Sequence, residues 1–128
     1  MKILANIAGG LLGLLFLLPA AMFVFHFGPK PEPPPEGSSA AMFMGAFGPT
    51  GYMTFVLVLE ALGGVLAAIP RTRNLGLLVL GPIIVNILAF HIFITKGEGL
   101  NNPMLIGIVV LALFLLWTDR KKFAHLMG

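Results

Sequence analysis

Three polar side chains in the middle of the chain could do chemistry inside a bilayer. Glu60 lies within the apolar run 52–69, and Asn86 and His91 lie within a second apolar run, 75–94. A charged, unpaired carboxylate at the centre of a bilayer costs about 2.5–3.5 kcal/mol on insertion scales. We therefore expect Glu60 to be protonated, hydrogen-bonded or open to a polar cavity.

A short basic turn, Pro70-Arg71-Thr72-Arg73-Asn74, separates the two runs. In an antiparallel hairpin centred on this turn, Glu60 and Asn86 reach similar depth, and the amide of Asn86 can donate a hydrogen bond to Glu60 or accept one. Two interpretations stay open. Glu60 carries protons or anchors the polar end of a bound quinone or lipid, or the pair is a hydrogen-bonded clamp between two helices.

Two histidines are weaker candidates for a cofactor site. His91 lies about 140° around a helix from Asn86, so these two residues do not share one narrow face. If haem or a metal were bound, His26 and His91 would be the pair from two helices that could hold it. Neither has a second ligand at helical metal spacing, and the sequence favours interfacial histidines without a metal. It predicts no cofactor other than a bound quinone or lipid.

The composition is that of an integral membrane protein. Of the 128 residues, 58% are hydrophobic and 10% are charged, against about a quarter charged in soluble domains. The absence of cysteine excludes disulfides and thiol redox chemistry. The net charge of +3 comes from basic residues that flank apolar runs, so we assign them to membrane topology and expect no nucleic-acid partner.

Four apolar stretches predict an all-α, four-transmembrane-helix bundle that forms one domain, 1–128. The expected spans are 3–27, 51–69, 75–94 and 103–118, each close to the roughly 20 residues that cross a bilayer. Pro19 and Pro82 should kink the first and third of them. A secretory signal peptide with a cleavage region at Pro19-Ala20-Ala21 is the alternative for the first run, but its length favours a span.

The connection after the first span has two parts. Residues 28–39 contain five prolines, which favour an extended outer loop. Residues 40–48 are apolar, rich in Met and Phe, and too short to span, which predicts a short interfacial helix. Its Met42, Phe43, Met44 and Phe47 could line an adaptable apolar site, although burial in the interface is the simpler interpretation.

Small residues predict close contact between the helices. Gly9 and Gly13 form one pair at a spacing of four, and Gly63-Gly64 with Ala67-Ala68 form two more. This spacing lets two helices in a membrane approach closely.

The charges predict the orientation in the membrane. With four spans, both termini and the basic turn share one side, which holds six of the eight basic residues. The opposite side holds Lys30 and Lys96. The positive-inside rule then places both termini in the cytoplasm of a bacterial cell, with the protein in its cytoplasmic membrane. The six residues on the inner side are Lys2, Arg71, Arg73, Arg120, Lys121 and Lys122.

The stretch 59–93 resembles the DoxX family of small four-helix bacterial membrane proteins. The resemblance is carried by Glu60-x-x-Gly63-Gly64, by the turn Ile69-Pro70-Arg71, and by the stretch from Asn86 to His91. The stretch that carries these motifs is about a third of the chain. The resemblance implies a four-helix architecture and association with membrane oxidoreductase assemblies, and it carries over no catalytic residue.

These observations predict a non-catalytic accessory or structural subunit of a larger membrane assembly, respiratory or otherwise concerned with electron transfer. Its partners would be the lipid bilayer and other membrane subunits or further copies of the chain. The alternative is a protein that binds or transfers a small lipophile, a quinone or lipid, through Glu60 and Asn86. A proton-coupled transporter is a third interpretation, for which a dimer would have to supply room for alternating access.

Overall fold

The computed structural model describes residues 2–29 and 32–128, and in these ranges it contains helices and no strands. The expected all-α fold is therefore confirmed. Lys30, assigned above to the outer side, lies outside the described residues. The elements are α1 (Lys2–Phe25), α2 (Ser39–Phe47), α3 (Tyr52–Ala68), α4 (Arg73–Ala89), the π-helical turn η1 (Phe90–Ile94), α5 (Pro103–Thr118), α6 (Arg120–Ala124) and the 3₁₀ turn η2 (His125–Met127).

Two helices are long and apolar enough to cross a membrane. One is α1, with a mean hydropathy of 2.3, and the other is the continuous stretch Arg73–Ile94 of α4 and η1, with a mean hydropathy of 2.5. Two further helix pairs are apolar enough but bent, by 85° between α2 and α3 and by 78° between α5 and the C-terminal helices. The described part of the chain thus has two candidate spans, or four if each bent pair is one span.

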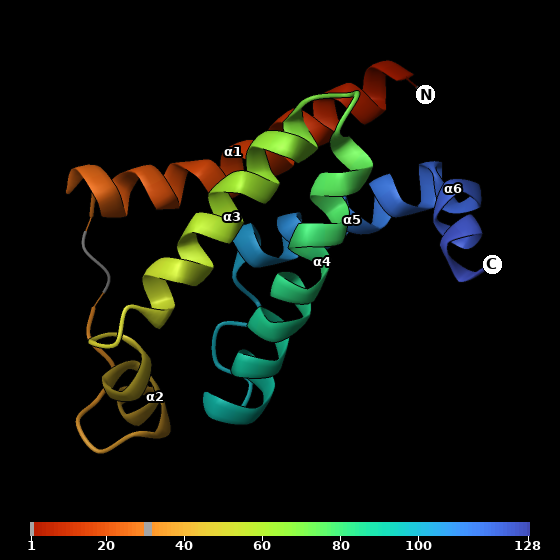
Figure 1. The fold of residues 1–128 in the computed structure, drawn as a ribbon. Coiled ribbons are helices and arrows are strands. Elements are labelled where there is room, and N and C mark those ends of the chain that lie inside the picture. The colour runs from red at the N-terminus through yellow and green to blue at the C-terminus, as the bar shows by residue number, and fades with distance from the viewer. Residues whose placement is uncertain (1, 30–31) are drawn as a thin grey trace.

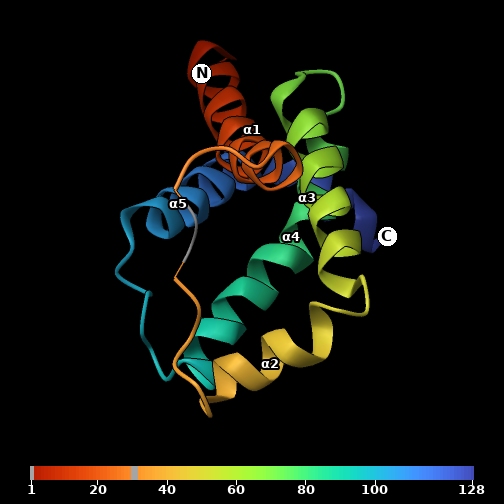
Figure 2. The same ribbon diagram turned by 90° about the vertical axis from the view of Figure 1, so that its left-hand side faces the viewer.

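The helices cross one another at marked angles (Figure 1). The hairpin of α3 and α4 lies at the centre, and the N-terminal half of α1 passes beside its turn. The C-terminal half of α1 diverges from α3, and α2 lies across the far end of the hairpin (Figure 2). The helices thus meet closely at the turn and separate beyond it.

The buried core lies where α1, α3, α4 and α5 meet. Its fully buried large side chains are Leu12, Leu80 and Leu115, one from each of α1, α4 and α5. From α3 the core takes Ala67, which is also fully buried. The small residue on α3 is what allows the larger side chains of its neighbours to meet around it.

Glycines let the backbones of α1, α3 and α4 touch. A Cβ atom on Gly13 would lie 2.7 Å from the Gly64 carbonyl oxygen, and one on Gly76 would lie 2.8 Å from the Gly63 carbonyl oxygen. Both distances are shorter than real Cβ contacts allow. The close packing predicted from the small residues is therefore present, and Gly76 of α4 extends it to a third helix.

Replacing Gly13 by valine should destabilise the fold, whereas valine at Gly10 should not. The two glycines belong to the same helix, but an added Cβ at Gly10 meets nothing within 4 Å. Because α1 and α3 cannot stay in contact around a valine, we expect Gly13→Val to cost about 1–3 kcal/mol of stability. Thermal unfolding of both variants in detergent micelles measures this, and equal midpoints would show that the glycine contact does not matter.

Candidate functional site

A cavity of about 900 Å³ lies at the end of the α3–α4 hairpin that is opposite its turn. Its walls come from α2, α3, α4 and η1. Most of the lining is apolar, and the polar side chains of Glu60, Asn86 and His91 all contribute to it. The apolar lining residues are Phe43, Met44, Phe47, Met53, Phe55, Val56, Leu59, Val79, Pro82, Ile83, Ile87, Ala89, Phe90, Phe93 and Ile94, and Tyr52 completes the set.

Aromatic contacts hold α2 against η1 and against the start of α3. The ring centroid of Phe43 lies 4.9 Å from that of Phe90 in η1 and 4.6 Å from that of Phe47. Phe47 in turn lies 4.8 Å from Tyr52 at the start of α3. The helix contributes no fully buried residue, so these rings are its main attachment. Phe43, Met44 and Phe47 therefore line an apolar site, and Met42 is exposed instead.

The carboxyl group of Glu60 projects from α3 into this lining. The side chain is half-buried, and no other described residue forms a hydrogen bond or an ion pair with it. Leu59 and Val79 line the same cavity. A carboxyl group that is partly withdrawn from solvent and lacks a protein partner is costly, because its lost hydration is not replaced.

Asn86 does not act as the partner of Glu60. Its Nδ2 donates a hydrogen bond of 2.9 Å to the carbonyl oxygen of Pro82, one turn earlier in α4. The expected hydrogen bond between Glu60 and Asn86 is not made, because the amide uses an acceptor in its own helix. The Oδ1 atom of Asn86 receives no hydrogen bond from the described residues.

His91 lies in the π-helical turn η1 and lines the same cavity. Its Nδ1 is 2.8 Å from the Ile87 carbonyl oxygen, and since a carbonyl only accepts, Nδ1 carries the proton. The following loop fixes the turn, because the Gly97 amide and the Thr95 hydroxyl both donate to the His91 carbonyl oxygen, at 2.6 and 3.0 Å. Single π-helical turns often occur at functional sites.

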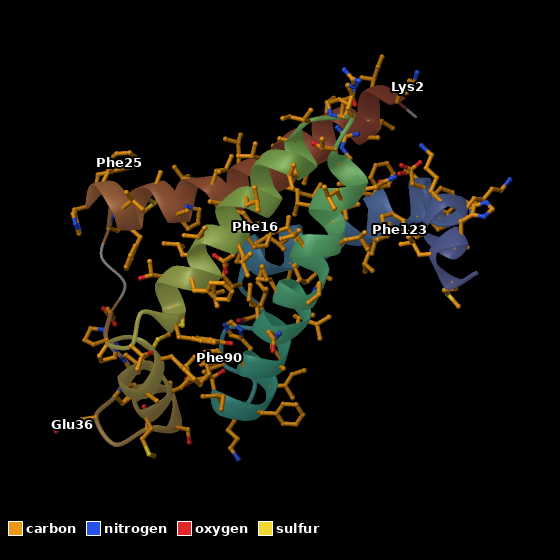
Figure 3. The ribbon with its side chains drawn as sticks, in the orientation of Figure 1. Lys2, Phe16, Phe25, Glu36, Phe90 and Phe123 are labelled. Atoms are coloured by element: carbon orange, nitrogen blue, oxygen red, sulfur yellow. The ribbon has the colours of Figure 1, made fainter. Side chains whose placement is uncertain are left out.

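The structure does not bring His26 and His91 together. His26 is exposed, with a φ of 55° just after the end of α1. Its neighbour Phe25 lies far from Phe90, the neighbour of His91, at the free end of α1 (Figure 3). Among the residues that the structure describes, no three His, Asp or Glu side chains gather as a metal site would require.

Arg73, predicted to mark the cytoplasmic side, is buried among three helices. Its Nε donates a 3.0 Å hydrogen bond to the carbonyl oxygen of Ala67, and both terminal nitrogens donate 3.2 Å hydrogen bonds to Oδ1 of Asn6. The Ala67 carbonyl belongs to the last turn of α3, where helical partners are missing. An added Cβ on Gly9 would lie 2.8 Å from the guanidinium carbon, so a glycine is needed there.

Further polar contacts surround Arg73. The Thr72 hydroxyl donates to the Leu66 carbonyl oxygen at 2.9 Å, and Asn74 Nδ2 donates to Asp119 Oδ2 at 2.9 Å. The second contact joins the start of α4 to the end of α5. The other basic residues assigned to topology are exposed, and Arg120 lies 4.4 Å above the ring of Trp117. These exposed residues are Lys2, Arg71, Arg120, Lys121 and Lys122.

Sequence reasoning missed this polar group, although two signals pointed to it. After Lys2, Asn6 is the one strongly polar residue in the first half of α1, which is otherwise apolar. Asp119 is the one acidic residue in the basic cluster after α5. Arginine offers five donors in a fixed fork, and two isolated oxygen-bearing side chains are the kind of acceptors it needs.

The fold and the cavity define an all-helical protein with two to four candidate spans and a largely apolar site at one end. The uncharacterized protein YwoB of Bacillus subtilis (strain 168) is 40% identical to the chain over 72 residues. The match covers 56% of this chain and 45% of that relative, so the chain spans about half of the relative's length at most. No family model matches the chain, and no solved structure matches it. The resemblance to the DoxX family therefore stays a prediction.

Replacing Arg73 by lysine should destabilise the protein, whereas the same change at Arg71 should be nearly neutral. A lysine ammonium cannot reproduce the fork that reaches Ala67 and Asn6 together, and hydrogen bonds to charged groups contribute about 1.5–3 kcal/mol. Arg71 is exposed in the same turn. Thermal unfolding in micelles compares the two variants. An Arg73→Lys midpoint as high as that of Arg71→Lys would contradict a structural role.

Proposed function

We propose that this chain is a multi-pass protein of the bacterial cytoplasmic membrane that binds a small lipophile, such as a quinone or a lipid, in the cavity between α2, α3, α4 and η1. The two bent helix pairs would each count as one span, which gives four spans with both termini in the cytoplasm. In this orientation the cavity lies toward the outer side, because it is at the end of the hairpin opposite the basic turn.

The observation that carries this proposal is the position of Glu60. It is a half-buried carboxyl group without a hydrogen-bonding or ionic partner in the part of the chain that the structure describes, and it lies in a cavity whose lining is otherwise largely apolar. Leaving a fully buried polar group unsatisfied costs about 1–3 kcal/mol, and a half-buried group carries a part of this cost. A ligand with a polar end would satisfy this group, and Asn86 Oδ1 is a second polar atom in the lining that lacks a partner.

The size and the lining of the cavity also fit a lipophile. Ligand sites usually occupy about 300–1,000 Å³ and combine apolar walls with a few polar groups; this cavity holds about 900 Å³. Met44 and Met53 in the walls have flexible, polarizable side chains that adapt to irregular apolar ligands. The polar groups in the lining suit binding and do not form a nucleophile–base pair, so we propose no catalysis.

A role as an accessory subunit is the second candidate, and it is favoured by the outer face of α1. Five exposed apolar residues recur there at alternating spacings of three and four, the spacing with which helices pack side by side. A neighbouring subunit or a second copy of the chain could cover this face in the membrane. The residues are Leu4, Ile7, Leu11, Leu14 and Leu18.

Filling the cavity should remove the lipophile. Ala89 lines the cavity, whereas Ala46 is an exposed residue of α2 outside the lining. We expect protein purified in mild detergent to carry a bound lipophile in native mass spectrometry, and Ala89→Trp to lose it because the indole occupies the same space. Ala46→Trp should keep it. Equal occupancy in the two variants would contradict the proposal.

The subunit role makes a separate prediction. If the outer face of α1 contacts another protein, Leu11→Ala with Leu14→Ala should shift the chain from a larger species to its own mass on native gels at native expression levels. The apolar pair Val58 and Leu62, on the exposed face of α3, provides the matched control. A wild-type chain that migrates alone in mild detergent would contradict the subunit role and leave the lipophile proposal standing.

A further inference from the structure

The charge of the cavity narrows the class of lipophile, if the chain binds one as proposed above. Among the lining residues that the structure describes, within 2–29 and 32–128, Glu60 is the one acidic residue, and none is a lysine or an arginine. Lys96, the basic residue nearest to η1 in the sequence, is exposed and not part of the wall. The buried guanidinium of Arg73 is at the other end of the hairpin. The described lining therefore provides a carboxyl group without a lysine or an arginine beside it.

The hydrogen-bonding atoms of the lining are mostly acceptors. The Nδ1 proton of His91 is directed at the Ile87 carbonyl oxygen, which leaves Nε2 as an acceptor. Asn86 uses one of its two N–H groups on the Pro82 carbonyl oxygen and keeps its own Oδ1 free. With the two oxygens of Glu60, the free acceptors outnumber the free donors, which are one N–H of Asn86 and the Tyr52 hydroxyl.

Aromatic rings line the same cavity as these acceptors. Phe43, Phe47, Tyr52 and Phe90 form a connected series along the walls from η1 through α2 to α3, with neighbouring centroids 4.6–4.9 Å apart. The faces of aromatic rings are electron-rich and attract cations, more strongly when water is excluded. A carboxylate and aromatic rings in one apolar cavity are the groups that recognise an ammonium ion on a hydrocarbon body.

We infer that the ligand is an amphiphilic amine, with a protonated amine or quaternary ammonium group beside Glu60 and an alkyl or aryl body along the apolar walls. A quinone is a poorer match, because its carbonyl oxygens only accept hydrogen bonds and would face the acceptors of the lining. A zwitterionic phospholipid is also a poorer match, because its phosphate would lie near the carboxylate and be repelled in this low-dielectric setting.

The test compares ligands that share one tail. Full-length protein in dodecyl maltoside micelles is dialysed to equilibrium against radiolabelled decylammonium, decanol, or a benzoquinone with a decyl substituent, and binding to empty micelles is subtracted. We expect decylammonium to bind at least about tenfold more tightly than either neutral ligand, since a charge-assisted hydrogen bond is worth that factor or more. Equal affinity for the three ligands would overturn the inference.

Variants at Glu60 separate charge from shape. Glu60→Gln should weaken decylammonium binding about tenfold or more and decanol binding much less, because the glutamine amide still hydrogen-bonds a hydroxyl group, whereas Glu60→Asp should keep most of the preference for the amine. Glu98→Gln, an exposed carboxyl outside the lining, should change nothing. Retained decanol binding also shows that Glu60→Gln is folded. Decylammonium binding that survives in Glu60→Gln at wild-type strength would overturn the inference.

The outcomes for the inference and for the proposed function are distinguishable. If decanol and the quinone bind and Ala89→Trp blocks them, but decylammonium has no advantage, the lipophile site stands and the amine preference fails. If none of the ligands binds, both fail. If phosphatidylethanolamine in mixed micelles displaces decylammonium at equal concentration, the site takes a lipid headgroup, and the inference of a small amine is overturned.

Discussion

The guanidinium of Arg73 is the interaction on which the arrangement of helices depends. It joins Asn6 of α1 to the last turn of α3 from the first residue of α4. A charge in an apolar setting is tolerated only when its hydrogen bonds are satisfied, and arginine beside a helix C-terminus also opposes the negative end of the helix dipole. Gly9 must leave space for it, and the glycine contacts of α3 then follow along the same interface.

The close packing at the turn of the α3–α4 hairpin accounts for the separation of the helices at the other end of the hairpin. Because α1, α3 and α4 are held together at the turn, any divergence between the helices accumulates toward the other end of the hairpin. There, α4 ends in a π-helical turn, and the gap is bridged by the aromatic side chains of α2 and η1 rather than by glycine contacts. The cavity is thus a consequence of the contacts that hold the helices together at the turn. Its acidic residue, Glu60, belongs to α3.

The sequence predicted the all-α fold, the close contacts of the glycines, and three polar residues that the structure places in one cavity. Each depends on a local pattern: apolar runs, small residues four apart, and rare polar residues within a run.

The sequence did not predict the partner of Asn86, because the carbonyl of Pro82 one turn away competes with the more distant Glu60. It assigned Arg73 to the membrane surface because a charge rule cannot foresee a contact with Asn6, 67 residues away. The pairing of His26 and His91, named only for the case that haem or a metal is bound, would need their helices to lie side by side, whereas the C-terminal half of α1 diverges.

The absence of a bond between Glu60 and Asn86 bears on why a carboxyl group is present at all. In a helix clamp, a hydrogen-bonding partner on the facing helix would offset the cost of burying the carboxyl group. Here the facing helix, α4, provides no such partner. The hairpin has no need of such a clamp, since Arg73 and the glycines already hold α3 to α4. The partly buried carboxyl group of Glu60 therefore lowers the stability of the fold without serving to hold its helices together. Polar groups that are kept at such a cost are typical of sites that bind a ligand or a partner. A cation that enters with a hydrocarbon body would remove the cost and supply the missing partner at once.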